Sequence, residues 1–185
     1  AECPRVVFLV RVPSGTEQSY VDILNNIFPD KTSDFVIRID DSDTVVVKEF
    51  KTEVQKEEIL RYAQNIFDTL SSEAMITPSV GISTVVDKIH ELSQAYRESR
   101  IALEVGKVFD TEKEIISYDN LGIGRLIYQL PTTLCELFLN EVFKKESINV
   151  LDSETIYTIQ KFFENNLNVS ETSRKLFVHR NTLVY

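Results

Sequence analysis

The feature that most constrains the fold is a change in hydrophobic period near residue 120. Before this point, short apolar runs typical of strands alternate with amphipathic stripes typical of helices, and after it only helical spacing remains. Two kinds of architecture therefore follow one another along the chain. We expect an α+β domain over residues 1–120 and an all-helical region over residues 121–185.

The first region contains five expected strands and three expected helices. The continuous apolar run of residues 6–10 is typical of a buried strand, and the polar cluster Asp40–Asp43 between two β-branched runs predicts a hairpin turn. The expected strands are residues 6–10, 35–39, 45–47, 79–83 and 115–118, and the expected helices are residues 20–27, 59–70 and 89–103, the last closed by Gly106. The order is strand, helix, strand, strand, helix, strand, helix, strand.

The second region reads as helices throughout. One apolar stripe over residues 123–130 is broken by Pro131, and another follows over residues 134–142. Asp152 and Ser153 form a credible N-cap for a further helix.

Charge is distributed unevenly along the chain. The net charge is -9, which argues against a general nucleic-acid coat protein. Residues 151–185 hold four cations and four anions and are neutral, so the whole -9 lies in residues 1–150. Residues 169–185 alone hold three cations and one anion. The acidic body and the mildly basic tail therefore predict two surfaces with different roles.

The two cysteines and two histidines do not have the spacing of a metal site. Cys3 and Cys135 indicate reduced thiols in a cytosolic protein, and His90 and His179 are far apart with no cysteine nearby. We expect no metal and no cofactor. No apolar run approaches the ~20 residues that span a bilayer, and the start lacks signal-peptide features. The first residue is not Met and Tyr185 falls in mid-pattern, so both ends look cut.

The segment 168–185 carries the clearest functional pattern. Ser170 is the expected cap of a short helix, Phe177–His179 form a turn, and a new helix opens at Arg180. The second helix of a helix-turn-helix places its first residues against base edges and phosphates, and Arg, Asn and Thr side chains are suited to those contacts. By composition alone, however, a short polar pair of helices is more often plain scaffold.

Residues 169–183 resemble the C-terminal helix-turn-helix of the PucR and CdaR regulators, which act on purine catabolism and sugar diacid use, and more distantly the Fis-type motif. The resemblance implies that Ser170–Leu176 is the positioning helix and that His179 or Arg180 begins the recognition helix. The implied DNA-binding residues are His179, Arg180, Asn181, Thr182, Ser170, Arg174 and Lys175. Family recognition helices continue for several more residues, so this chain alone is expected to bind DNA poorly.

Residues 77–83 and 94–103 resemble the last third of the GGDEF (diguanylate cyclase) fold, in the degenerate form found in CdaR-type regulators. The resemblance spans residues 5–120. It implies a GGDEF-like domain with a ferredoxin-like, cyclase-type antiparallel sheet.

Cyclase chemistry is not expected from these residues. It needs metal-binding carboxylates from the first strand and the hairpin, and glycines in the hairpin loop. The first strand ends in Val12–Gly15 with no carboxylate, and the hairpin 39–44 has no glycine. Asp40, Asp41 and Asp43 could attract a cation, although a solvated turn is the better explanation of them. Ser14–Gly15 could cradle a phosphate, but a lone Ser-Gly pair after a strand is a weak signal. We therefore expect that this protein is not an enzyme.

These observations predict a bacterial cytoplasmic transcriptional regulator. We expect it to activate a catabolic operon for sugar diacids or purines. Its GGDEF-like domain would serve signal relay or dimerisation. The expected partners are double-stranded DNA, a second copy bound through residues 121–143, and a small effector sensed by a missing N-terminal domain. Two alternatives stay open: a nucleotide-binding sensor module, and a residual enzyme.

Overall fold

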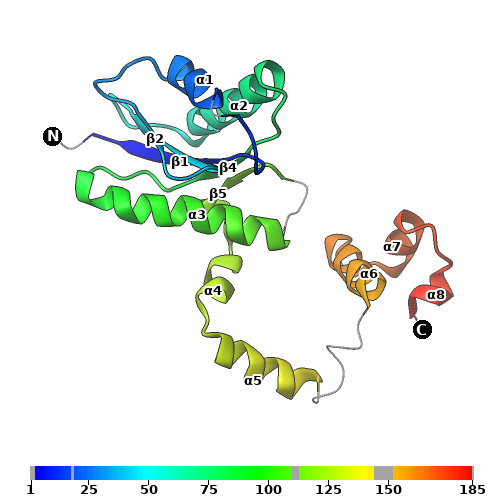
Figure 1. Ribbon diagram of the computed structural model, residues 1–185. Coiled ribbons are helices and arrows are strands. Elements are labelled where there is room, and N and C mark those ends of the chain that lie inside the picture. Colours follow the sequence, from blue (N-terminus) through cyan, green and yellow to red (C-terminus); the bar gives the residue numbers. More distant parts are fainter. Residues whose placement is uncertain (1–2, 18, 110–112, 144–151, 185) are drawn as a thin grey trace. The chain divides into compact units, whose positions relative to one another are not determined.

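The computed structural model describes residues 3–17, 19–109, 113–143 and 152–184. The chain divides into two compact units, Ala1–Gln129 and Leu130–Tyr185. We call them the sheet unit and the helical unit (Figure 1). The last helix before the division, α4 (Gly124–Gln129), belongs to the sheet unit.

The sheet unit follows the predicted order of strands and helices. Its elements are β1 (Arg5–Arg11), α1 (Tyr20–Ile27), β2 (Phe35–Arg38), β3 (Asp43–Glu49), α2 (Lys56–Glu73), β4 (Ser79–Ile82), η1 (Ile89–Glu91), α3 (Leu92–Phe109), β5 (Ile115–Ser117), η2 (Tyr118–Leu121) and α4. The two η elements are short 3-10 helices that lead into α3 and α4.

The strands form one sheet in the order β2-β3-β1-β4-β5, which confirms the α+β fold class. The pairs β2–β3, β3–β1 and β1–β4 are antiparallel, as expected. The pair β4–β5 is parallel, so the sheet is mixed, and the expected antiparallel arrangement holds everywhere except at this edge. The reason is the long helix α3, which returns the chain to the starting end of β4 before β5 begins.

Helices cover both faces of the sheet: α1 and α2 lie on one face and α3 on the other (Figure 1). Val6, Phe8 and Val10 of β1 join the core beneath α1 and α2. Val7 and Leu9 join the core beneath α3. Burial on both faces explains why β1 is a continuous apolar run with no polar alternation. Each such side chain contributes about 1.5–3 kcal/mol when it leaves water.

Two glycines let α3 approach the sheet closely. A Cβ atom at Gly81 would lie 2.1 Å from the carbonyl oxygen of Ser99 in α3. A Cβ atom at Gly106 would lie 2.2 Å from Cδ1 of Ile116 in β5. The prediction that Gly106 ends the helix is wrong, because α3 continues to Phe109. Gly106 is needed for contact with the strand and not for a change of chain direction.

The helical unit contains α5 (Thr132–Phe143), α6 (Ser153–Glu164), α7 (Val169–Lys175) and α8 (Arg180–Val184). The predicted cap of α6 is confirmed: an Asp152 carboxylate oxygen accepts from the Thr155 amide at 2.7 Å. This bond is the first cause that lowers the pKa of Asp152. In the part of the chain that the structure describes, no helix is long and apolar enough to cross a bilayer.

Candidate nucleic-acid interface

Helix α7 begins at Val169 and is capped by Asn168 and not by Ser170, so the predicted cap is wrong. The side-chain oxygen of Asn168 accepts from the Glu171 amide at 3.1 Å, and its backbone is extended. Ser170 lies inside the helix, where its carbonyl oxygen accepts from Arg174 Nε at 3.2 Å. The signal was present in the sequence, because Asn followed three residues later by Glu is a pattern typical of a helix start.

The turn after α7 has a specific backbone geometry. The amide of Phe177 donates to the carbonyl of Arg174 at 3.3 Å, and the amide of Val178 donates to the carbonyl of Ser173 at 3.0 Å. This bond pair is the Schellman motif, whose left-handed residue is usually glycine. Here that residue is Phe177, with φ of 55° and a side chain that is 97% exposed. The motif ends α7 and sends the chain into the next helix.

The preceding helix, α6, ends with the same motif. The amide of Asn166 donates to Phe163 at 3.0 Å, and the amide of Leu167 donates to Phe162 at 2.9 Å. Asn166 has a φ of 52°, and asparagine tolerates that conformation well. Two successive motifs of one kind therefore set the directions of α7 and α8.

Helix α8 opens with an exposed first turn. The Asn181 amide donates to Nδ1 of His179 at 3.3 Å, and the Thr182 amide donates to the His179 carbonyl at 2.9 Å. His179 thus precedes and caps the helix, whose first residue is Arg180. The four side chains from 179 to 182 are all exposed. Tyr185 lies outside the described residues.

Two small polar residues bring α7 against its neighbours. Thr172 is fully buried and Ser173 is 6% exposed. The Thr172 hydroxyl donates to the carbonyl of Asn168 at 2.8 Å, and the Ser173 hydroxyl donates to that of Ser170 at 3.1 Å. Because these hydroxyls are satisfied within the helix, α7 can contact both α6 and α8 without leaving a buried polar group unpaired.

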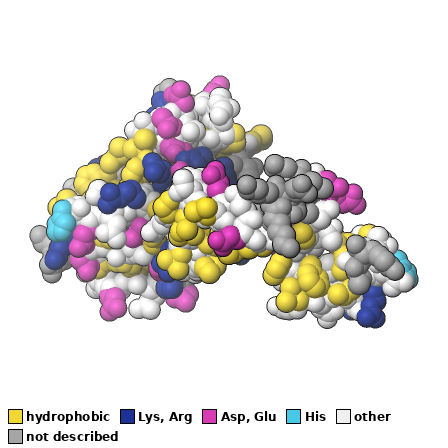
Figure 2. Space-filling model, turned by 90° about the horizontal axis from the view of Figure 1, so that it is seen from below, with side chains coloured by type: hydrophobic (Ala, Val, Ile, Leu, Met, Phe, Trp, Pro, Cys, Tyr) yellow, Lys and Arg dark blue, Asp and Glu magenta, His cyan; other side chains and the backbone are white. Residues whose placement is uncertain are grey.

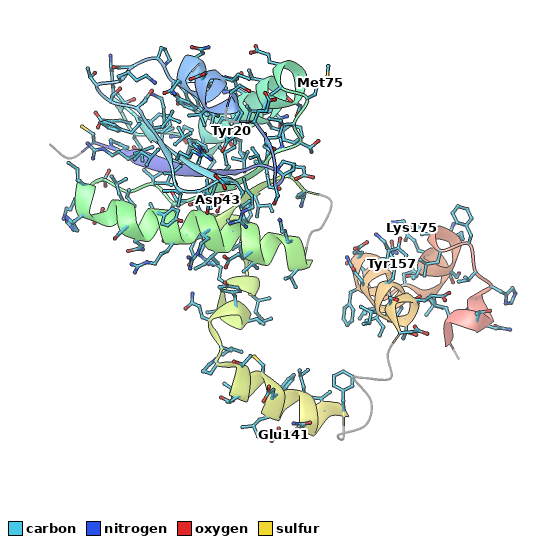
Figure 3. All side chains as sticks on the ribbon, viewed as in Figure 1. Tyr20, Asp43, Met75, Glu141, Tyr157 and Lys175 are labelled. Carbon is cyan, nitrogen blue, oxygen red and sulfur yellow. The ribbon has the colours of Figure 1, made fainter. Side chains whose placement is uncertain are left out.

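The cations that are predicted to contact DNA lie on the exposed surface of α7 and α8. Arg174, Lys175 and Arg180 are exposed, and among the described residues none of them has a carboxylate within 4 Å. In α6, by contrast, Lys161 donates to Glu164 at 2.8 Å, and this bond is the first cause that lowers the pKa of Glu164. Figure 3 labels Lys175 on α7, and Figure 2 shows positively charged side chains beside hydrophobic ones on this unit.

The hairpin between β2 and β3 uses its carboxylates for internal bonds. The Asp40 carboxylate accepts from the amides of Ser42 and Asp43, both at 2.8 Å, and these bonds hold its pKa below the ordinary value. Asp41 accepts from Arg38 at 2.5 Å. A turn closed in this way fits the solvated-turn interpretation.

Asp43 is also occupied, by a cation from the first strand. Arg11 of β1 donates from Nε and Nη2 to the two carboxylate oxygens of Asp43, each at 2.7 Å, and this pairing raises the pKa of Arg11. Figure 3 labels Asp43 at the sheet. Among the described residues, no group of three or more His, Cys, Asp or Glu side chains is placed to hold a metal ion.

Two family models match this chain, one in the sheet unit and one in the helical unit. Residues 1–105 match the model of the GGDEF-like domain, and residues 155–185 match the PucR C-terminal helix-turn-helix domain. The purine catabolism regulatory protein of Bacillus subtilis (strain 168) is 24% identical over 128 residues. That alignment covers 69% of this chain and 24% of the relative, so the chain spans about a quarter of the relative's length.

A crystal structure of a regulator of polyketide synthase expression from Bifidobacterium adolescentis matches with a TM-score of 0.49 at 20% identity. The match covers 100% of this chain and 69% of the other. The family models span more than half of the sequence and fall on the sheet and on helices α6 to α8. The chain belongs to the GGDEF-like domain family, and in it that domain is joined to a PucR-type C-terminal helix-turn-helix.

Proposed function

We propose that this chain is part of a bacterial transcriptional regulator that binds double-stranded DNA through α7 and α8. The observation that carries the proposal is the exposed first turn of α8, inside the segment that matches a helix-turn-helix. The first residues of such a helix meet base edges in the major groove. In residues 169–185 the only acidic side chain is Glu171, in the first turn of α7.

The exposed residues divide into two groups by their chemistry. Arg180 can bind guanine bidentately, Asn181 can bind adenine, and Thr182 can meet a thymine methyl group or a phosphate. The second group would contact the sugar-phosphate backbone of DNA, and it consists of Ser170, Arg174, Lys175 and His179. These contacts position the protein on DNA and carry little sequence information.

The regulated genes and the role of the sheet unit belong to the same proposal. The Bacillus subtilis relative is named as a regulator of purine catabolism, and this supports a purine catabolic operon as the target, with sugar diacid use as the second possibility. That the regulator acts as an activator, in the cytoplasm, is part of the proposal. The effector would act on another domain of the regulator. The sheet unit would serve signal relay or dimerisation without catalysis, since Asp40, Asp41 and Asp43 are all engaged by protein groups.

Helix α5 supports the proposal of a homodimer. It has no buried residue among its twelve. Leu137 and Phe138 are 61% and 62% exposed, and Leu134 and Val142 are about half exposed. An apolar helix surface of this kind is typical of an association site. Sedimentation should show a dimer that Leu137→Lys converts to a monomer, and a monomer at high micromolar concentration for the unaltered chain would contradict the proposal.

The DNA proposal is tested on the full-length regulator, because the 185-residue chain alone is expected to bind DNA poorly. A preferred site is first selected from random duplexes, and affinity is then measured by fluorescence anisotropy at two salt concentrations. Arg180→Ala should cost about 1–3 kcal/mol and relax specificity at one base pair. Lys175→Ala should weaken all sequences alike and lower the salt slope by about one unit.

The control for these two variants is Lys161→Ala, because Lys161 lies in α6 and is paired with Glu164. It should leave affinity and salt slope unchanged. An Arg180→Ala variant with unaltered affinity and specificity would refute the assignment of α8 as the recognition helix. Formation of cyclic dinucleotide from nucleoside triphosphate with Mg²⁺ or Mn²⁺, above a protein-free control, would refute the non-catalytic role of the sheet unit.

A further inference from the structure

A cleft of about 170 Å³ lies in the sheet unit at the carboxyl ends of the parallel strands β4 and β5. Its lining comes from three segments: residues 54–60 at the start of α2, residues 82–85 after β4, and residues 117–120 around η2. Clefts outside the carboxyl ends of parallel strands are the usual place for ligands in open α/β sheets. The β2–β3 hairpin lies beside Arg11 at the carboxyl end of β1, and the cleft lies toward the other end of that strand. The cleft is therefore separate from the hairpin that carries Asp40, Asp41 and Asp43.

The inner part of the cleft is apolar. Ile82 of β4 is 1% exposed, and Ile59 of α2, which packs in the same core, is 8% exposed. Leu60 and Val85 are exposed and form the walls of the cleft. A dry apolar cavity of about 150 Å³ holds a molecule the size of benzene. The cleft can therefore accept one aromatic ring with a small substituent.

The polar groups that remain available lie at the rim. Lys56 and Asp119 form a loose ion pair, in which Nζ is 3.6 Å from Oδ2, and the two side chains, 72% and 39% exposed, keep hydrogen-bonding capacity for a ligand. The Ser83 hydroxyl is already engaged, because it accepts from the Val7 amide and donates to the Thr84 carbonyl. Lys56, Asp119 and the exposed Asn120 thus offer one ammonium, one carboxylate and one amide.

This balance of charge decides which molecules fit. A carboxylate or phosphate at the rim would meet Lys56 and also the like charge of Asp119. A neutral amide would donate to Asp119 and accept from Lys56 or Asn120, so each group at the rim would gain a partner. The cleft therefore favours an uncharged ligand over a nucleotide.

We propose that this cleft binds a small uncharged aromatic or heteroaromatic amide, with its ring against Ile59 and Ile82 and its amide edge at Asp119 and Asn120. The proposal does not depend on DNA binding. A ligand in this position would join α2 to η2, the segment that leads from β5 into α4.

Two probes of the same shape test the proposal. Benzamide and benzoate are titrated into the isotope-labelled 185-residue chain, and backbone amide shifts are followed by NMR. Benzamide should shift resonances of residues 54–60, 82–85 and 117–120, with a dissociation constant on the order of 1 mM for a fragment of this size. Benzoate should bind at least about tenfold more weakly. Equal or tighter binding of benzoate would overturn the proposal.

Variants at the cleft locate the binding site. Val85→Phe fills the cleft from its wall and should weaken benzamide binding at least about tenfold. Val108→Phe is the control, because Val108 is 69% exposed on α3 and does not line the cleft. Asp119→Asn removes the repelling carboxylate and should narrow the difference between the probes. Benzamide shifts that survive Val85→Phe, or that never appear in these segments, would overturn the proposal.

Discussion

The guanidinium of Arg11 donates from Nε and Nη2 to both carboxylate oxygens of Asp43, each at 2.7 Å, and so ties β1 to β3 at the mouth of the hairpin. The Asp43 side chain is 8% exposed and that of Arg11 is 25% exposed. Asp43→Asn should lower the free energy of unfolding by about 2 kcal/mol, because a charge-assisted bidentate pair is lost and Arg11 keeps a partly buried charge.

The control for this prediction is Asp41→Asn. Asp41 is also paired with an arginine, but its side chain is 98% exposed, so its loss should change stability by less than about 0.5 kcal/mol. Urea denaturation followed by circular dichroism measures both variants. Equal effects would show that burial does not strengthen the Arg11 pair.

The loop before β2 gives a prediction about pH. The hydroxyls of Thr32 and Ser33 and the amide of Thr32 donate to Asp30, and they lower its pKa from 3.8 to about 2. A depressed folded pKa stabilises the native state above the unfolded pKa. The contribution of Asp30 is therefore present above pH 3.8 and is lost as pH falls toward 2.

NMR titration of the Asp30 carboxyl carbon checks this value. The double variant Thr32→Val, Ser33→Ala should return the pKa most of the way toward 3.8, since both hydroxyl donors are removed. A pKa that stays near 2 in the double variant would show that the hydroxyls are not the cause.

Asn168 and Ser170 are the two candidates for the cap of α7, and alanine substitutions distinguish them. Asn168→Ala should destabilise the helix by about 1 kcal/mol, because the Glu171 amide loses its partner. Ser170→Ala should change stability by less than about 0.5 kcal/mol, because Ser170 is exposed inside the helix. Native-state hydrogen exchange of the α7 amides measures both, and a larger effect at Ser170 would restore the cap predicted from sequence.

The left-handed residue after α7 predicts a stabilising substitution. Phe177 has a φ of 55° and almost no buried side chain, so Phe177→Gly removes backbone strain without losing packing. We expect a gain of about 1 kcal/mol in the helical unit. Asn166→Gly, at the equivalent position after α6, should gain less, because asparagine already tolerates this conformation. Hydrogen exchange of the α7 and α8 amides measures both variants. A larger gain in stability for Asn166→Gly than for Phe177→Gly would show that Phe177 is not strained.

The two close approaches of α3 predict unequal costs for the same change. Gly81→Ala places a Cβ atom against the backbone oxygen of Ser99, which cannot move without shifting α3, and should cost about 3 kcal/mol. Gly106→Ala meets only the Ile116 side chain, which can rotate, and alanine favours the helix by about 1 kcal/mol. Thermal unfolding should therefore show a clearly smaller loss for Gly106→Ala, and equal losses would contradict this account.

Local patterns fixed most of the elements. The apolar run of β1, the hairpin at Asp40–Asp43 and the cap at Asp152 were each predicted correctly, because each depends on neighbouring residues. The family resemblance of residues 169–183 was carried by consecutive positions and is confirmed by the helix-turn-helix match. The contacts of residues 179–182 with DNA stay a prediction.

The sequence by itself determined the order of strands and helices, because hydrophobic period and turn residues act over a few positions. Only the tertiary structure decided what depends on residues far apart in the chain. It made β4 and β5 parallel, placed Gly106 against Ile116, paired Arg11 with Asp43, and opened a cleft between α2 and η2. Each of these joins residues at least ten positions apart, and no local pattern specifies which distant side chains will meet when both faces of the sheet are buried.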